Sequence, residues 1–220
     1  LDLTDRLDPN GRLAWDVPEG DWTILRFGRT TTGANTRPAP QPGLGFECDK
    51  FDPAALDAHF DAFVGTLLRE IGPRPTDRKT GWTMLHIDSW EMGSQNWTAK
   101  FAEQFELRRG YSPRPWLPVM TGRIVGSTER SERFLWDLRQ TAQELVLENH
   151  AGHLKELGRQ HGGLRAPLVV GGNEIDRVEV EILQHQRRRR RHARFGVPHG
   201  GRRQTGDRPE IPLLVHQHGP

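Results

Sequence analysis

The sequence has very little cysteine and no long hydrophobic run. Its 220 residues include one cysteine, Cys48, and one tyrosine. A single cysteine excludes an internal disulfide framework and a four-cysteine zinc site. No apolar run approaches the ~18 residues that a membrane-spanning helix needs, so the sequence predicts no transmembrane segment. Hydrophobic residues make up 34% of the chain, which is enough for a core of modest size. The first residue is Leu rather than Met, which predicts a cut or processed end.

Aromatic side chains are nearly missing from residues 161–220. This part has no tryptophan or lysine and one aromatic residue, Phe195. It holds 11 basic and 6 acidic residues, whereas residues 1–160 hold 20 and 23. With one aromatic residue, this part cannot bury enough apolar surface to offset an ordering cost of about 1–2 kcal/mol per residue. We therefore predict that residues 161–220 form an Arg/His/Gly-rich tail that is largely disordered or comes from a non-native reading frame.

The tail contains five consecutive arginines at positions 187–191. Such a run could contact phosphates, but no aromatic residues interleave with it to stack on bases, and no zinc-finger pattern accompanies it. We expect no nucleic-acid partner. A basic interaction protein led by the tail stays open as one functional alternative.

Residues 1–34 carry β-strand signals. The segment from Trp22 to Phe27 is rich in strand-forming residues. Turn residues separate it from Trp15, which favours a β-hairpin. We assign residues 1–34 to the end of a β domain or to a β-hairpin segment, and the proline-rich stretch after it to a loop.

Residues 35–160 alternate strand and helix patterns. Asp52 and Pro53 are typical of a helix start, and Gly72 is typical of a helix end. The apolar run at 82–87 favours a strand buried on both faces. The alternation predicts an α/β fold with a parallel sheet, whose sites lie in the loops after the strands. The predicted helices are Pro53–Ile71 with Leu56, Phe60, Phe63, Leu67 and Ile71 on one face, Thr98–Arg109 capped by Thr98, and a long helix from about Ser127 to Leu157.

Polar and aromatic residues are densest in residues 86–98, directly after the predicted strand. Tryptophan faces stack on sugar C–H groups, amides bond hydroxyls, and carboxylates do acid–base work at a glycosidic bond. The pattern favours a carbohydrate site. The alternative is a loop whose polar groups satisfy the backbone while its tryptophans fill the core. The candidate residues are Asp88, Trp90, Glu91, Gln95, Asn96 and Trp97.

A second polar cluster comes just before the first predicted helix. Glu47, Asp49 and Lys50 could bind a polar ligand, or a hard cation through oxygen. The alternative assigns Asp52 to helix capping and Lys50 to the solvated surface. His150 and His153 lie three residues apart on the long predicted helix, and we expect both to be exposed polar residues rather than metal ligands.

Several stretches together resemble glycoside hydrolase family 106, the α-L-rhamnosidases. The resemblance covers about residues 10–160 and is specific as an ensemble. The matching stretches are Trp15-Asp-Val-Pro-Glu-Gly-Asp-Trp-Thr-Ile, Arg26-Phe-Gly-Arg-Thr-Thr-Thr-Gly, Arg37-Pro-Ala-Pro, Gly45-Phe-Glu-Cys-Asp-Lys-Phe-Asp, His86-Ile-Asp-Ser-Trp-Glu and Gln95-Asn-Trp-Thr.

The resemblance implies a fold and a reaction. It implies the opening βα units of a (β/α)8-type catalytic barrel, incomplete in this chain, over residues 35–160. It also implies an inverting glycosidase that uses two carboxylic acids and a bound calcium on rhamnose-containing oligosaccharides or polysaccharides. Glu91 matches one of the two acids, as general acid or general base, with the acid favoured. A secreted or periplasmic location is implied as well.

The chain departs from the family after residue 160. The second catalytic glutamate and the later barrel strands should follow there, and no family-like sequence does. We therefore expect little or no glycosidase activity from this chain alone. A non-catalytic carbohydrate-binding module that keeps the tryptophan and glutamine contacts is the alternative function.

Overall fold

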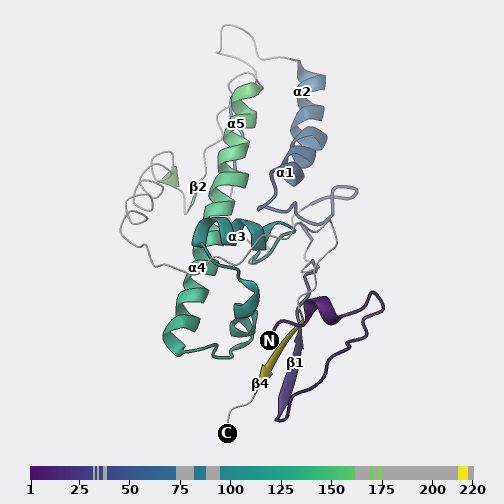
Figure 1. The fold of residues 1–220 in the computed structure, drawn as a ribbon. Coiled ribbons are helices and arrows are strands. Elements are labelled where there is room, and N and C mark those ends of the chain that lie inside the picture. The colour runs from purple at the N-terminus through teal and green to yellow at the C-terminus, as the bar shows by residue number, and fades with distance from the viewer. Residues whose placement is uncertain are drawn as a thin grey trace. The chain divides into compact units, whose positions relative to one another are not determined.

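The computed structural model describes residues 1–31, 33, 35–36, 39–72, 82–87 and 95–161, and the backbone of three short strands beyond them (Figure 1). It divides into two compact units. Unit 1 comprises Leu1–Thr32, Asn96–Thr141 and His199–Pro220, and unit 2 comprises Gly33–Gln95 and Ala142–Pro198. The described residues are mainly helical.

The sheet content of the described residues is small and antiparallel. Strand β1 (Trp22–Arg26) pairs with β4 (Leu213–Gln217), and β2 (Val169–Val170) pairs with β3 (Asn173–Glu174). The predicted mixture of helices and strands is present, but these residues show no barrel and no parallel pair. A (β/α)8 barrel needs eight neighbouring parallel strands, and the described part of the chain does not supply them.

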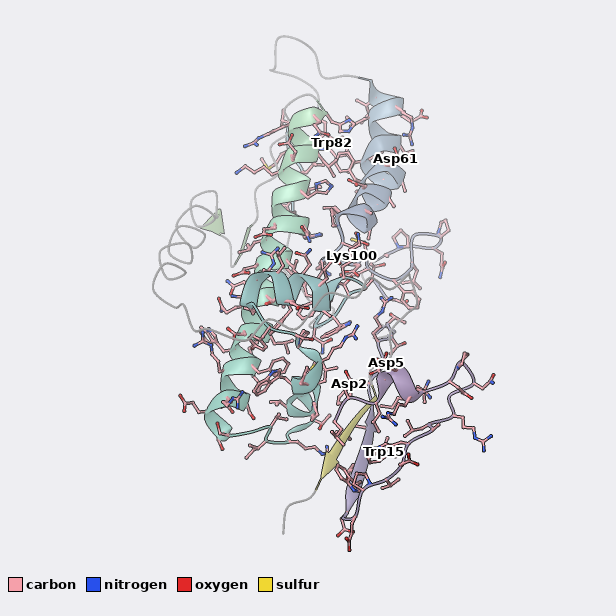
Figure 2. The ribbon with its side chains drawn as sticks, viewed as in Figure 1. Asp2, Asp5, Trp15, Asp61, Trp82 and Lys100 are labelled. Atoms are coloured by element: carbon pink, nitrogen blue, oxygen red, sulfur yellow. The ribbon has the colours of Figure 1, made fainter. Side chains whose placement is uncertain are left out.

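In unit 1, the first strand takes a partner that the sequence did not predict. β1 pairs with β4 along all five of its residues, rather than with the segment that carries Trp15. Trp15, labelled in Figure 2, instead contacts Trp22 edge to face, with ring centroids 5.3 Å apart. The two rings pack with Leu7 and Leu13 around the buried Leu3, which directly precedes the 3-10 helix η1 (Thr4–Arg6). The two tryptophans are therefore neighbours, but the predicted hairpin between their segments is not formed.

The helices of unit 1 enclose an aromatic core. They are α3 (Phe101–Arg109), the 3-10 helix η3 (Arg114–Thr121) and the part of α4 (Thr128–Val146) that precedes residue 142. Phe105 is fully buried and contacts the rings of Tyr111 and Phe134 at 5.0 and 5.8 Å. The predicted cap at Thr98 is wrong, because α3 begins at Phe101 with Lys100 at the N-cap position.

The first helical segment of unit 2 begins where the sequence predicts. Helix α1 (Pro53–Phe60) starts at the predicted proline, and the Asp52 carboxylate accepts a hydrogen bond of 3.1 Å from the backbone N–H of Ala54. The π-helical turn η2 (Asp61–Gly65) and helix α2 (Thr66–Ile71) follow without a break. Gly72, with φ of 83°, ends α2, a conformation that glycine adopts without steric cost.

The buried face of this segment differs from the predicted one. Leu56 and Phe60 are buried as expected, but Phe63 is 56% exposed and Val64 is 5% exposed. A π turn closes i→i+5 hydrogen bonds and so holds more residues per turn than an α-helix. Successive inward positions therefore fall four residues apart, which brings Val64 rather than Phe63 to the core.

The long predicted helix forms, with a π turn inside it. Helix α4 continues through η4 (Leu147–Gly152) into α5 (His153–Gln160). In unit 2, Leu154 and Leu157 of α5 pack against a cluster of Phe60, Val64 and Leu85. This cluster is the core that holds α5 to α1, η2 and the 82–87 segment.

Residues 82–87 do not behave as a strand buried on both faces. Leu85 and Ile87 are buried, whereas Met84 and His86 are exposed. This alternation is typical of an extended segment with one face on a core and one face open. The expectation of a strand buried on both faces is wrong, because Met84 and His86 are exposed.

Most of the tail lies outside the described residues, so its predicted disorder stays a prediction. Strand β4 nevertheless places one paired strand within the tail. Among the described residues, no helix combines the length and the apolarity that crossing a membrane requires.

Candidate functional site

The predicted site residues are distributed over three parts of the chain. Glu47, Asp49, Lys50 and Gln95 lie in unit 2, and Asn96 and Trp97 lie in unit 1. The remaining three candidates lie outside the described residues: Asp88, Trp90 and Glu91.

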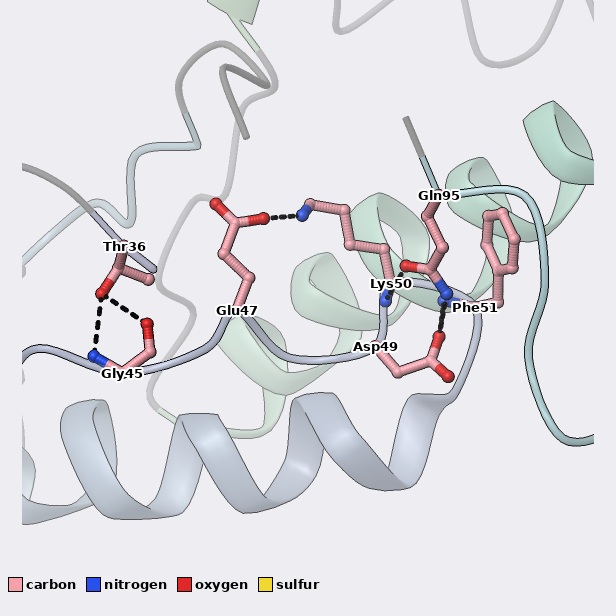
Figure 3. Close-up of polar contacts among 7 residues, drawn as sticks. All are labelled: Thr36, Gly45, Glu47, Asp49, Lys50, Phe51 and Gln95. Atoms are coloured by element: carbon pink, nitrogen blue, oxygen red, sulfur yellow. Dashed lines mark hydrogen bonds and ion pairs between the residues drawn. The ribbon is translucent and has the colours of Figure 1, made fainter. Parts of the chain in front are cut away.

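Unit 2 brings the two predicted polar clusters together through the side chain of Gln95 (Figure 3). Its Oε1 accepts a hydrogen bond of 3.0 Å from the backbone N–H of Lys50. Its Nε2 donates to the carboxylate of Asp49. Residues that stand 46 positions apart in the sequence are therefore joined at one point.

The loop that receives Gln95 is held from other directions as well. The Asp49 carboxylate also accepts a 2.9 Å hydrogen bond from the backbone N–H of Phe51. The Phe51 side chain is 3% exposed, and its carbonyl accepts a 2.7 Å hydrogen bond from Asn149 Nδ2 on η4. Buried aromatic packing and paired backbone groups make this short loop a rigid part of unit 2.

Lys50 and Glu47 form an ion pair at the same loop (Figure 3). Their side chains are 15% and 32% exposed. A pair that is partly open to solvent contributes little to stability, so its contribution to folding does not explain the two charges. The pair offers both ammonium donors and carboxylate acceptors to a polar ligand.

His150 is a neighbour of this loop that the sequence analysis expected only as an exposed polar residue. It lies on η4, half-buried, and burial lowers the pKa of its imidazole; the nearby Lys50 lowers it further, while Glu47 acts in the opposite direction. The expectation of an exposed His150 is therefore wrong. His150 follows Asn149, whose side chain bonds the loop at Phe51. The sequence alone does not show this contact, so it could not show that His150 lies beside the loop.

The other histidine of that helix also has a partner. His153 Nε2 lies 2.6 Å from Asp57 Oδ1 on α1, which ties α5 to α1 at the surface of unit 2.

Cys48, between the two charged residues of the loop, has the pKa of its thiol raised mainly by burial. A raised pKa keeps the thiol protonated at neutral pH, so Cys48 is no activated nucleophile.

Trp97 and Asn96 have different surroundings within unit 1. The ring of Trp97 is half-buried and contacts Phe101 of α3, with centroids 4.7 Å apart and an interplanar angle of 32°. Asn96 is exposed. Trp97 therefore packs partly as a core residue, as in the alternative interpretation in which the tryptophans of this loop fill the core.

The described residues do not fit a calcium site. No group of three or more His, Cys, Asp or Glu side chains in the described ranges could hold a metal ion. Glu47 is paired with Lys50, and Asp49 bonds Gln95 and Phe51. A calcium ion takes six to eight oxygen ligands, and these side chains do not supply such a set.

Three comparisons relate the chain to known proteins. The model of glycoside hydrolase family 106, described as alpha-L-rhamnosidase, matches residues 1–170. A protein of Formosa agariphila named "Putative beta-glucuronidase" is 40% identical over 164 residues, which cover 74% of this chain and 14% of that protein.

The third comparison is with a solved structure, that of a rhamnosidase from Novosphingobium sp. PP1Y. It matches with a TM-score of 0.61 and 33% identity, over 76% of this chain and 16% of that one. The chain thus spans about one seventh of the length of these relatives. The family model covers well over half of the chain, including both polar clusters. The chain therefore belongs to glycoside hydrolase family 106, the alpha-L-rhamnosidases.

Proposed function

We propose that this chain carries part of the active site of a glycosidase that cleaves α-L-rhamnosyl linkages in plant or microbial glycans. The observation that carries the proposal is the family match over residues 1–170, which includes the Asp88-Ser-Trp-Glu91 motif. The solved relative is itself a rhamnosidase, which supports rhamnose as the sugar.

Glu91 is assigned as one of two carboxylic acids of an inverting mechanism, with the general-acid role favoured. Inverting glycosidases hold their two carboxyl groups about 6.5–9.5 Å apart, with a water molecule between the second group and the sugar. Asp88 stands three residues from Glu91 in the chain, and we assign it to sugar binding. The second acid is then supplied from outside the family-matched stretch, and we propose that this chain alone turns substrate over slowly or not at all.

The Glu47–Lys50 pair is assigned to the sugar hydroxyl groups. Both charges are partly exposed at a rigid loop, and a charged donor and acceptor side by side suit a vicinal diol. Trp90, Trp97 and Asn96 are proposed as further sugar contacts. Calcium binding at the sugar and a secreted or periplasmic location are proposals that rest on the family alone.

The test is the substitution Glu91→Gln in the longest protein that contains this chain, assayed on an aryl α-L-rhamnoside. General acid–base groups contribute about 10²–10⁴ to turnover, so we expect kcat to fall by at least about 10²-fold while substrate binding survives. Glu103→Gln, on the exposed side of α3, is the matched control. Activity of Glu91→Gln within about threefold of the parent, where a catalytic group should cost at least about 10²-fold, would show that Glu91 is structural.

A non-catalytic carbohydrate-binding module is the second candidate. It is favoured by Trp90 and Trp97, because tryptophan faces stack on sugar C–H groups without any catalytic role. Rhamnoside binding by calorimetry with no release of the aryl group, in every protein that contains this chain, would establish that reading instead.

A further inference from the structure

Gln95 stands out because both ends of its carboxamide are bonded to one loop of the protein. Oε1 accepts from the backbone of Lys50 at 3.0 Å, and Nε2 donates to Asp49 (Figure 3). A side chain that recognises a sugar directs its amide to the ligand. This one directs both of its polar atoms to the chain.

The loop is suited to serve as an anchor. Asp49 bonds the Phe51 N–H at 2.9 Å, Asn149 bonds the Phe51 carbonyl at 2.7 Å, and the Phe51 side chain is buried. The backbone at Lys50 is thus held on both sides. A side chain that bonds to the Lys50 backbone is therefore held in a defined position.

We propose that Gln95 and Asp49 are positioning residues of the glycosidase site rather than sugar contacts. Gln95 holds the chain where the segment with Glu91 ends, and it orients the backbone of Lys50, whose side chain pairs with Glu47. Glu91 stands four residues before Gln95, and four residues span at most about 14 Å. The assignment of a chemical role to this anchor rests on the proposed function of Glu91.

Loss of the anchor should lower turnover more than it weakens substrate binding. A misplacement of about 1 Å at a reacting group can cost on the order of 10²-fold in rate. The sugar contacts proposed for Glu47 and Lys50 are side-chain contacts, so loss of the anchor should weaken them less. Substitution of Gln95 is therefore expected to lower kcat and to change KM little.

The test uses an exchange of functional groups between the two residues. Gln95→Met removes both hydrogen bonds at nearly the same side-chain length. The double variant Gln95→Glu/Asp49→Asn keeps the net charge, and its new amide at position 49 donates to the new carboxylate at position 95. That carboxylate still accepts from the Lys50 N–H. In the parent, Oδ1 of Asp49 accepts from both Gln95 and Phe51, so the amide at position 49 has to turn until its oxygen faces the Phe51 N–H and its nitrogen faces position 95.

Kinetics on an aryl α-L-rhamnoside distinguish positioning from sugar contact. We expect Gln95→Met to lower kcat by at least about 10-fold with KM within about threefold, an effect typical of lost alignment. The exchanged double variant should recover most of kcat, whereas Gln95→Glu alone should not, because it sets two carboxylates together. A rise in KM with unchanged kcat and no recovery in the double variant would overturn the proposal.

Amide hydrogen exchange gives a readout that does not depend on activity. The Lys50 amide should exchange at least about 10-fold faster in Gln95→Met, since a lost hydrogen bond of about 1.4 kcal/mol equals a factor of ten, and protection should return in the double variant. Gln104→Met is the matched control, because the Gln104 side chain accepts its hydrogen bond from Arg108 on the same helix. Unchanged exchange at Lys50 in Gln95→Met refutes the anchor even where no turnover is measured. Full activity of Glu91→Gln with altered exchange at Lys50 would refute the proposed function and leave the anchor standing.

Discussion

Tyr111 allows a direct test of the unit 1 core, because it is the only tyrosine in the chain. Its hydroxyl donates a 3.0 Å hydrogen bond to Asp137 Oδ2, and Asp137 is 7% exposed. Burial, followed by the negative charge of Asp137, raises the pKa of Tyr111 far above its usual value. The phenol is thus held in its neutral form by the fold.

The direction of the pH effect follows from this shift. The pKa of Tyr111 is higher in the folded chain than in the unfolded one, where it is about 10. The stability that this group contributes is therefore fully present below about pH 10 and is lost as the pH rises above it. Tyrosinate should appear only where the fold is being lost.

The magnitude comes from the hydrogen bond that Tyr111→Phe removes. Bonds to charged groups contribute about 1.5–3 kcal/mol. The lower part of that range is expected here, because Arg133 Nε still lies 3.3 Å from the Asp137 carboxylate and satisfies part of it. The free energy of unfolding of unit 1, from denaturant titration below pH 9, should fall by about 1.5–2 kcal/mol.

The assay is the near-ultraviolet absorbance of tyrosinate against pH, with circular dichroism recorded on the same samples. Asp137→Asn removes the charge but not the burial, so the pKa of Tyr111 should fall and still stay above about 10. Tyr111→Phe supplies the blank. A parent protein whose tyrosine ionises near pH 10 with its helices intact would refute the reasoning.

Two further predictions concern unit 2. Val64→Ala should destabilise the chain by about 1.5–3 kcal/mol, because it removes two buried methyl groups at about 0.8 kcal/mol each and leaves a cavity. Phe63→Ala, at an exposed neighbour, should cost well under 1 kcal/mol, and equal losses at the two positions in denaturant titrations would contradict the observed helix face. The lowered pKa of His150 means that its contribution to stability is present above about pH 6.5 and is lost at lower pH. His150→Gln should flatten the acid limb of the stability profile, and an unchanged limb would mean that His150 is solvated.

Elements with local causes were readable from the sequence. The start of α1 at Pro53 depends on Asp52, one residue away, and the ends of α2 and α3 depend on glycines with φ of 83° and 82°. The long helical run from α4 through α5 follows from its apolar spacing. Caps, glycine turns and periodicity act within a few residues, so the chain order alone contains the information.

The candidate site was likewise predictable from the sequence only in its local features. The two polar clusters, at 45–52 and 86–98, could be recognised as chemically unusual from their residues and from the family resemblance. That Gln95 bonds Asp49 and Lys50, and that Asn149 secures Phe51, could not, because these contacts join positions 45 to 98 residues apart. The choice among such distant partners depends on the packing of whole segments.

Tertiary packing also overrode two local patterns. The π turn η2 rotates Val64 into the core in place of Phe63, and β1 takes β4 rather than the nearer Trp15 segment as its partner. An apolar residue one position away satisfies the same periodicity, and a strand edge accepts any extended chain that reaches it. The free energies of these alternatives differ only through contacts made in the folded state, so the three-dimensional structure was needed to choose between them.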